Sequence, residues 1–305
     1  MKQTKYGHSH NINAACKTVS AITAAFVIFV ATSLTSCVKD ELYDTPHPDH
    51  GKVAVTADWT ARGEGIAMPE KWTVNIGDYT GEETTETHAP DYLFTPGEYS
   101  IIAYNPAENI TVSGTTASVA LGNGKSNFIS GAPGILFTYV QDITIEKDKV
   151  HEFTATMRQQ TGSITLMIEP TSDAAGRIES IAGSLSGVAG TMDFATGTYD
   201  APSDVALHFT KITEGENAGK WTATAWLLGI TGDAQRLSAT IAYTDGNPQP
   251  TVLESDLTEA LKEFNKDKTE ALTLGGSVVE TPTETGVTAE ITDWKTVDGE
   301  PTEAI

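Results

Sequence analysis

Short segments in which every second residue is apolar run through most of the chain, and this period-two pattern predicts β-strands. The clearest is KVAVTADW at residues 52–59, whose apolar side chains would share one face of a strand. We expect further strands at 72–76, 99–104, 110–113, 118–121, 135–138, 142–146, 150–158, 163–169, 178–186, 221–228, 236–243, 271–274 and 287–294. Strands at this spacing, separated by turns rich in Gly and Pro, predict β-sandwiches or barrels.

Two segments depart from this alternation. The glycines at 187 and 190 are expected to turn the chain after the strand at 178–186. Leucines at 253, 257 and 261 recur at helical spacing and Ser255 is placed to cap them, so we predict one short helix at 255–264. The prediction is an all-β protein with two tandem sandwich domains, 52–159 and 160–296, the helix lying in the second, and an acidic tail at 297–305.

The N-terminus has the pattern of a secretory signal. Residues 1–17 carry three lysines and no acid, and an apolar run of 16 residues follows at 18–33. A transmembrane helix needs about 20 apolar residues, so this run is too short for one. The run ends in Leu34-Thr35-Ser36-Cys37, which resembles a lipobox. We therefore predict cleavage between Ser36 and Cys37 and lipidation of Cys37, with residues 1–36 as the signal peptide; the alternative is an ordinary signal peptide with a chance cysteine.

Residues 37–51 are polar and contain two prolines, which predicts a flexible tether between the lipid and the fold. Lys39, Asp40 and Glu41, just after Cys37, resemble the surface-export signal of Bacteroidota lipoproteins. The alternative is a solvated linker. The histidines and aspartates at 44–50 would have to order a flexible segment to bind a metal, so we expect no metal site there.

Charge and motifs exclude several functions. The 305 residues carry 41 acidic and 19 basic side chains, a net charge of −22, which disfavours binding to nucleic-acid phosphates. The Gly-Lys-Ser at 124–126 lacks the first glycine of a phosphate-binding loop, and the GSLSG at 183–187 has no following helix to form a nucleophile elbow. His151 and His208 lie in strand-like contexts. We therefore expect no enzyme activity, no cofactor and no bound metal.

The order of several segments resembles the fimbrillin-type anchor and accessory subunits of Bacteroidota, the FimB/Mfa-type family. The matching segments are GKVAVTADW, FTPGEYSIIAYN, MRQQTGSITLMIE, IESIAGSLSGVAG, LLGITGDAQRLSATIAYTDG, LTEALKEFNKDKTEALTLGG and EITDW, within residues 37–296. The resemblance implies transthyretin-like sandwiches, lipid anchoring in the outer membrane, and fimbrial subunits as partners in a surface fimbrium. It implies an anchor or accessory subunit that supports assembly and adhesion.

The resemblance also raises the question of processing. Polymerising subunits of such systems are cleaved after a basic residue in the first domain, which removes the first strand and opens a groove for a neighbour's strand. Arg62 follows the predicted first strand and is the candidate cleavage site; the alternative is a surface arginine in a Gly-rich turn. A stalk or tip subunit therefore remains an alternative role. A surface glycan-binding lipoprotein is another, and would need an exposed row among the five tryptophans.

Overall fold

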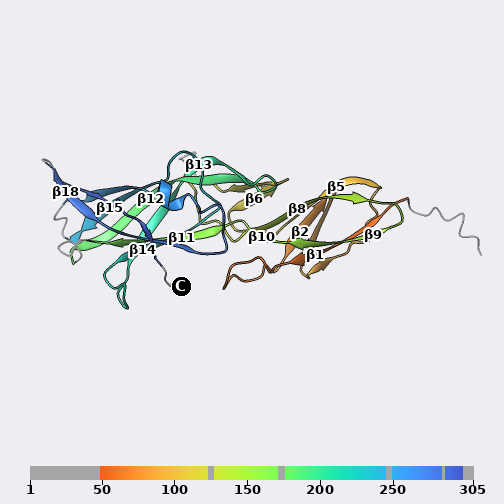
Figure 1. Cartoon of the computed structure of the whole chain (residues 1–305), viewed down its shortest axis with the longest axis horizontal. Coiled ribbons are helices and arrows are strands. Elements are labelled where there is room, and N and C mark those ends of the chain that lie inside the picture. The colour runs from red at the N-terminus through yellow and green to blue at the C-terminus, as the bar shows by residue number, and fades with distance from the viewer. Residues whose placement is uncertain (1–48, 123–126, 171–175, 245–248, 284–285, 298–305) are drawn as a thin grey trace, which may run out of the picture. The chain divides into compact units, whose positions relative to one another are not determined.

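The computed structural model describes residues 49–122, 127–170, 176–244, 249–283 and 286–297. Strands are numbered in chain order, and Figure 1 labels many of them. The predicted signal cleavage site at Ser36 and Cys37 lies outside the described residues, as does the predicted export signal of Lys39, Asp40 and Glu41.

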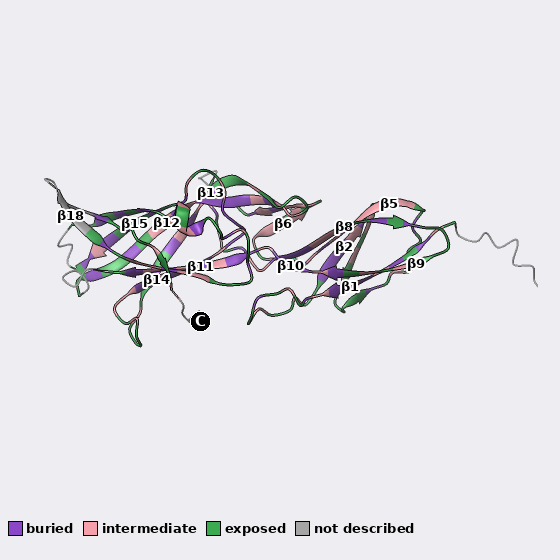
Figure 2. Cartoon of the chain, viewed as in Figure 1, coloured by how far each residue is buried: buried purple, intermediate pink, exposed green. Residues whose placement is uncertain are grey.

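Two sheets in the first half of the described chain share one hydrophobic core. The smaller sheet has the order β4–β1–β9, with bounds Thr87–His88, Lys52–Asp58 and Val150–Thr156. The larger has the order β10–β8–β5–β2–β3, with bounds Arg158–Gln159, Phe137–Ile145, Gly97–Tyr104, Trp72–Ile76 and Tyr79–Glu83. Buried side chains of both sheets form one cluster, and Figure 2 shows buried positions recurring along these strands. The two sheets therefore pack as a sandwich.

The remaining strands form a larger sandwich around a second hydrophobic cluster. One layer contains β6 (Ile110–Ser113), β7 (Thr116–Val119), β12 (Ile178–Asp193), β15 (Arg236–Tyr243), β16 (Thr251–Asp256), β18 (Val279–Thr283) and β19 (Gly286–Glu290). The other contains β14 (Trp221–Leu227), β11 (Gly162–Glu169), β17 (Leu272–Ser277) and β20 (Lys295–Thr296). The long strand β13 (Thr198–Lys211) pairs with β12 and, at its end, with β14, so it joins the two layers.

The hairpin of β6 and β7 belongs to this second sandwich by its pairing, although it precedes residue 159. Thr191, Met192 and Asp193 of β12 pair with Ser118, Ala117 and Thr116 of β7. Ala117 and Val119 are buried in the second cluster.

The predicted turn at 187–190 is wrong. Strand β12 continues through it, and the pairing with β13 shifts register between Leu185 and Val188. Gly187 has φ +71°, and a Cβ there would clash with the main-chain oxygen of Ala234. Glycine is the residue that adopts this conformation without strain, so the irregularity is a β-bulge that bends the strand rather than ending it.

The predicted helix at 255–264 is also too long. Helix α2 covers only Thr258–Leu261, and the segment holding Leu253 and Ser255 is strand β16. Ser255 does not cap the helix: its hydroxyl donates to the main-chain oxygen of Ile291 and accepts a hydrogen bond from Trp294 Nε1 at 2.7 Å. Leu257, Leu261 and Phe264 are buried, as their spacing indicated. The all-β prediction with one short helix is confirmed.

Candidate functional site: the seat of the first strand

The first strand is held on both of its edges. All seven residues of β1 pair in parallel with β9, from Lys52 opposite Val150 to Asp58 opposite Thr156. On the other edge, Val55 and Thr56 pair antiparallel with His88 and Thr87 of β4. The strand is therefore the centre of its sheet, and its removal would leave an open slot between β4 and β9.

One face of β1 fills the first core. Val53, Val55 and Ala57 are at most 4% exposed, and Trp59 just beyond the strand is 6% exposed. The Trp59 ring meets Phe137 of the facing sheet edge-on, with ring centroids 5.6 Å apart. Because burial of a Val-sized side chain stabilises by about 1.5–3 kcal/mol, these contacts make β1 costly to withdraw without a replacement.

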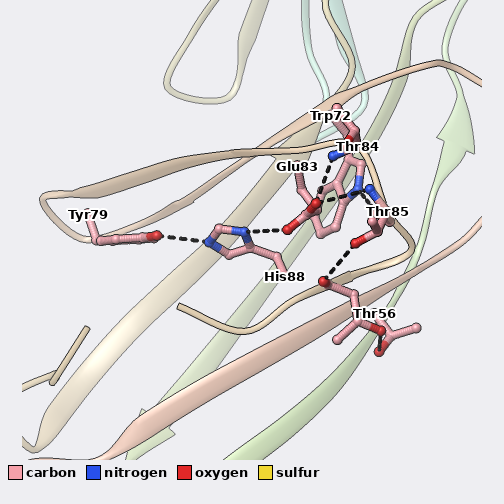
Figure 3. Close-up of polar contacts among 8 residues, drawn as sticks. Thr56, Trp72, Tyr79, Glu83, Thr84, Thr85 and His88 are labelled. Atoms are coloured by element: carbon pink, nitrogen blue, oxygen red, sulfur yellow. Dashed lines mark hydrogen bonds and ion pairs between the residues drawn. The ribbon is translucent and has the colours of Figure 1, made fainter. Parts of the chain in front are cut away.

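A network of polar side chains holds β4 beside β1 (Figure 3). His88 of β4 is 7% exposed, and its Nε2 lies 2.9 Å from the Tyr79 hydroxyl of β3. Its Nδ1 has no hydrogen-bond partner among the described residues but lies 3.5 Å from Glu83 Oε2, an ion-pair distance once the imidazole is protonated. The side chain of His88 thereby links β4, at the edge of the small sheet, to β3, at the edge of the large one.

Glu83 fixes the loop that leads into β4. Its carboxylate accepts hydrogen bonds from the main-chain N–H groups of Thr84 and Thr85, at 2.8 and 3.0 Å. The Thr85 N–H, followed by that of Thr84, lowers the pKa of Glu83 below its ordinary value. Burial, with the Glu83 charge second, raises the pKa of Tyr79. The Glu83 carboxylate therefore stays charged beside the neutral Tyr79 phenol. Its hydrogen bonds fix the conformation of the loop that leads into β4, the neighbour of β1.

Two further contacts fasten this loop to its neighbours. Trp72 Nε1 donates to the main-chain oxygen of Thr85 at 2.8 Å, and the hydroxyls of Thr56 and Thr87 lie 2.9 Å apart across the β1–β4 pair. In Figure 3, Trp72, Thr85 and Thr56 lie on the side of the network away from Tyr79. The chain upstream of β1 is held too, since Gly51 and Phe94 exchange both main-chain hydrogen bonds, at 2.8 and 2.9 Å.

Arg62, the candidate cleavage site, lies in the turn that follows β1. Its Nη1 donates to the main-chain oxygen of Trp59 at 3.0 Å and its Nε to that of Ile66 at 3.1 Å. The next residue, Gly63, is buried; its N–H donates to Gln159 Oε1 at 3.0 Å, and a Cβ there would clash with the Thr269 oxygen. A protease binds its substrate as an extended, accessible backbone, so the bond after Arg62 is poorly presented.

The other residues weighed from the sequence do not converge on a site. Trp59, Trp72 and Trp221 are buried, and Trp226 and Trp294 are half-buried, so the tryptophans form no exposed row. The Nε2 of His151 accepts the Glu146 N–H at 2.9 Å and its ring stacks on Phe153, whereas His208 is exposed on β13. In the part of the chain that the structure describes, no group of His, Cys, Asp and Glu is arranged to hold a metal ion.

Sequence reasoning missed the network around His88. The segment at 79–88 reads as a Thr- and Glu-rich loop, and alternation of charged and small residues gave no strand signal for β3 or β4. The one available signal was a histidine ending this polar stretch. Among the described residues, no helix is long and apolar enough to span a bilayer.

The fold and the strand seat define a class of tandem β-sandwich proteins, and comparison with known proteins specifies it. The family of fimbrillin-A associated anchor proteins Mfa1 and Mfa2 matches residues 72–300. The chain belongs to this family, whose members are fimbrial proteins. It is thus a fimbrial surface protein that associates with other fimbrial subunits. No curated protein sequence matches.

Solved structures share the fold at low sequence identity. The fimbrial anchor protein Mfa2 from Porphyromonas gingivalis aligns with a TM-score of 0.53 and 13% identity, covering 81% of this chain and 97% of that one. A candidate adhesin from Bacteroides ovatus gives 0.51 and 18%, covering 87% and 97%. A candidate polysaccharide-binding protein from Bacteroides thetaiotaomicron gives 0.54 and 12%, covering 77% and 96%. These likenesses support the sandwich architecture.

Proposed function

We propose that this protein is the lipid-anchored subunit at the base of a fimbrium and that it retains its own first strand. The observation that carries the proposal is the occupied seat of β1, paired on both edges and buried on one face. A subunit that keeps this strand offers no slot there for a neighbour's strand, so a fibre would end at this subunit on that side.

The sequence before the described fold supports the membrane part of the proposal. Ser36-Cys37 is the proposed cleavage and lipidation site, and residues 37–51 are the tether between the acyl chains and β1. Two or three acyl chains hold a protein at a bilayer almost permanently, since each buried CH₂ contributes about 0.8 kcal/mol. Lys39, Asp40 and Glu41 are the proposed signal for display on the outer face of the outer membrane.

The turn at Arg62 supports retention. Its guanidinium is engaged with main-chain oxygens on both sides of the turn, and Gly63 is packed against Thr269. In a stalk subunit the corresponding turn would have to be accessible to a protease. On this proposal the peptide bond after Arg62 stays uncleaved, and the Arg62 side chain holds the two sides of the turn together.

Intact-mass spectrometry of the protein purified from outer membranes tests both parts of the proposal. The expected mass corresponds to a chain beginning at Cys37, with added acyl chains and with residues 52–59 present. Cys37→Ala should leave the membrane fraction, with the fold unchanged. A wild-type chain beginning at Gly63 would instead identify a processed stalk or tip subunit. An unmodified Cys37 in a membrane-bound protein would refute the lipid anchor.

A further inference from the structure

The second sandwich has a groove with the features of a binding surface. This groove is not part of the seat of β1. It has a volume of about 1680 Å³ and is bordered by α2, the start of β17 and the segment around β20. The turn at Arg62 to Gly65 forms part of its rim. We call it the acidic groove because its walls carry the carboxylates of Asp256, Glu259, Glu263, Asp267, Glu270 and Asp293.

Few positive charges balance these carboxylates. Arg62 and Lys262 are the cations of the lining, and Glu64 on the rim adds a seventh carboxylate. Lys262, Lys266 and Lys295 pair with Glu259, Glu263 and Asp293, but these pairs are exposed and contribute little. Among the described residues Glu270 has no ion pair. A ligand with positive side chains is therefore attracted to the groove.

The floor of the acidic groove is apolar. Phe264 is buried there, and Leu272, Trp294 and Val297 are half-buried. The Trp294 ring is fixed by its hydrogen bond to Ser255 and by close packing on Gly276. A fixed, half-exposed indole offers a face to an alkyl stem or a cation. The groove thus suits a segment that carries both basic and aliphatic side chains.

The groove also reaches the start of β17, which begins at Leu272. Among the described residues, β20 pairs with Leu274 and Gly275 of β17, and Val297 N–H donates to Thr273 oxygen at 3.0 Å. Ala271 is exposed and lines the groove, and no strand pairs with it within the described part of the chain.

We propose that the acidic groove binds an extended, basic segment of another protein, which lies along the start of β17. The carboxylates and the apolar floor would select alternating Lys or Arg and aliphatic residues. The chain's own residues 298–305 are a poor occupant, because they carry three acids and no base. This proposal does not depend on retention of β1.

The test uses a fluorescein-labelled ten-residue peptide of alternating Lys and Val as the probe, with the mature soluble chain from residue 38. Fluorescence anisotropy at low salt should show saturable binding, and a Glu–Val peptide should not bind. The triple variant Glu259→Gln, Glu263→Gln, Glu270→Gln should weaken binding by about tenfold or more. The matched control is Glu152→Gln, Glu179→Gln, Glu214→Gln, three exposed acids outside the groove, which should change it by less than about twofold.

Amide hydrogen exchange locates the contact. Bound probe should slow exchange at Ala271 and Leu272, which a diffuse charge attraction would leave unchanged. Equal losses in the two triple variants, or no saturable binding, would overturn the proposal. If deletion of residues 298–305 raises the probe's affinity more than about tenfold, the chain's own tail fills the groove and the assignment to a partner is wrong.

Discussion

At the scale of single residues, Lys268 is the most unusual ionisable group of the described chain. It is 6% exposed, and no carboxylate of the described residues forms an ion pair with its ammonium group. Its Nζ donates to Asn265 Oδ1 at 3.1 Å and lies over the rings of Phe264 and Tyr199, 4.0 and 5.2 Å from their centroids. Burial lowers the pKa of Lys268 to about 7. The two rings favour the charged amine, but only partly offset its lost hydration.

This lowered pKa makes stability depend on pH in a definite direction. Between about pH 7 and 10.5 the unfolded chain holds a proton on Lys268 that the folded chain has released, so stability should rise with pH across this window. Below pH 7 the full cost of burying the charge applies, on the order of a few kcal/mol. Lys268→Met should therefore stabilise the protein most at pH 6 and progressively less by pH 9.5, measured by urea denaturation.

The matched control is Lys266→Met, since Lys266 is exposed and near in sequence. It should change stability by less than about 0.5 kcal/mol at either pH. A constant difference between Lys268→Met and wild type from pH 6 to 9.5 would contradict the lowered pKa.

At the scale of elements, the sequence predicted those strands whose one face is buried and whose other face is polar. Strands β1, β11, β14 and β15 lie within a residue or two of their predicted bounds, because local alternation and burial agree there. Strands β3 and β13 were missed: β3 has no buried residue, and β13 has none in its first five positions. Their existence depends on partners far away in the chain, which periodicity does not report.

The helix error has a related cause. Residues 253, 255 and 257 alternate as in a strand, and residues 253, 257 and 261 recur as in a helix, so the same leucines satisfy both patterns. Because β16 pairs with β15, this segment forms a strand up to Asp256. The opposite error occurs at Gly187. The sequence predicted a turn there, but the glycine forms a β-bulge that only bends a paired strand.

A disulfide between β1 and β4 tests whether β1 ever leaves its seat. Thr56→Cys with Thr87→Cys should form one in the oxidising periplasm, since the two hydroxyls are 2.9 Å apart. An anchor that retains β1 should assemble fimbriae normally with this disulfide, as judged by electron microscopy of whole cells.

The chain offers a matched control for this disulfide. Thr165→Cys with Thr224→Cys would link β11 and β14 through hydroxyls 2.8 Å apart, without touching β1. Loss of fimbriae in the first variant alone, restored by reduction, would mean that β1 is exchanged and that the subunit belongs to the stalk.

At the scale of the whole molecule, the candidate site was only partly predictable. The sequence placed Arg62 directly after the first strand, and the structure does so too. The slot between β4 and β9 could not be predicted from the sequence, because it joins residues near 55, 88 and 153 through pairings that leave no local pattern. In the same way, the sharing of the β6–β7 hairpin with β12 depends on contacts about 75 residues apart.

Two C-terminal deletions test the role of the last strands. Among the described residues, removal of 295–305 takes away β20 and the half-buried Val297, and the protein should fold with a small loss of stability. Removal of 287–305 also takes away the buried Ala289 and Ile291 and leaves the Ser255 hydroxyl without Trp294. Loss of Ile291 alone should cost about 2–5 kcal/mol, a large share of typical stability, so this variant should be degraded.

Circular dichroism and cellular protein levels distinguish the two deletions. If both variants fold and only fimbrial assembly fails, residues 287–294 act as a strand donated to a neighbour, and the anchor proposal is wrong.

The parallel pairing of β1 with β9 has a mechanical consequence. A pull on the chain just before Lys52 acts on the start of β1, whereas the chain leaves β9 at the opposite end, after Thr156. A load between these two points slides the strands past each other, so the ladder hydrogen bonds share it instead of peeling apart one at a time. A protein tethered through its N-terminus and pulled by a fibre would thus be loaded along the strands. This is the direction in which the sheet resists rupture best.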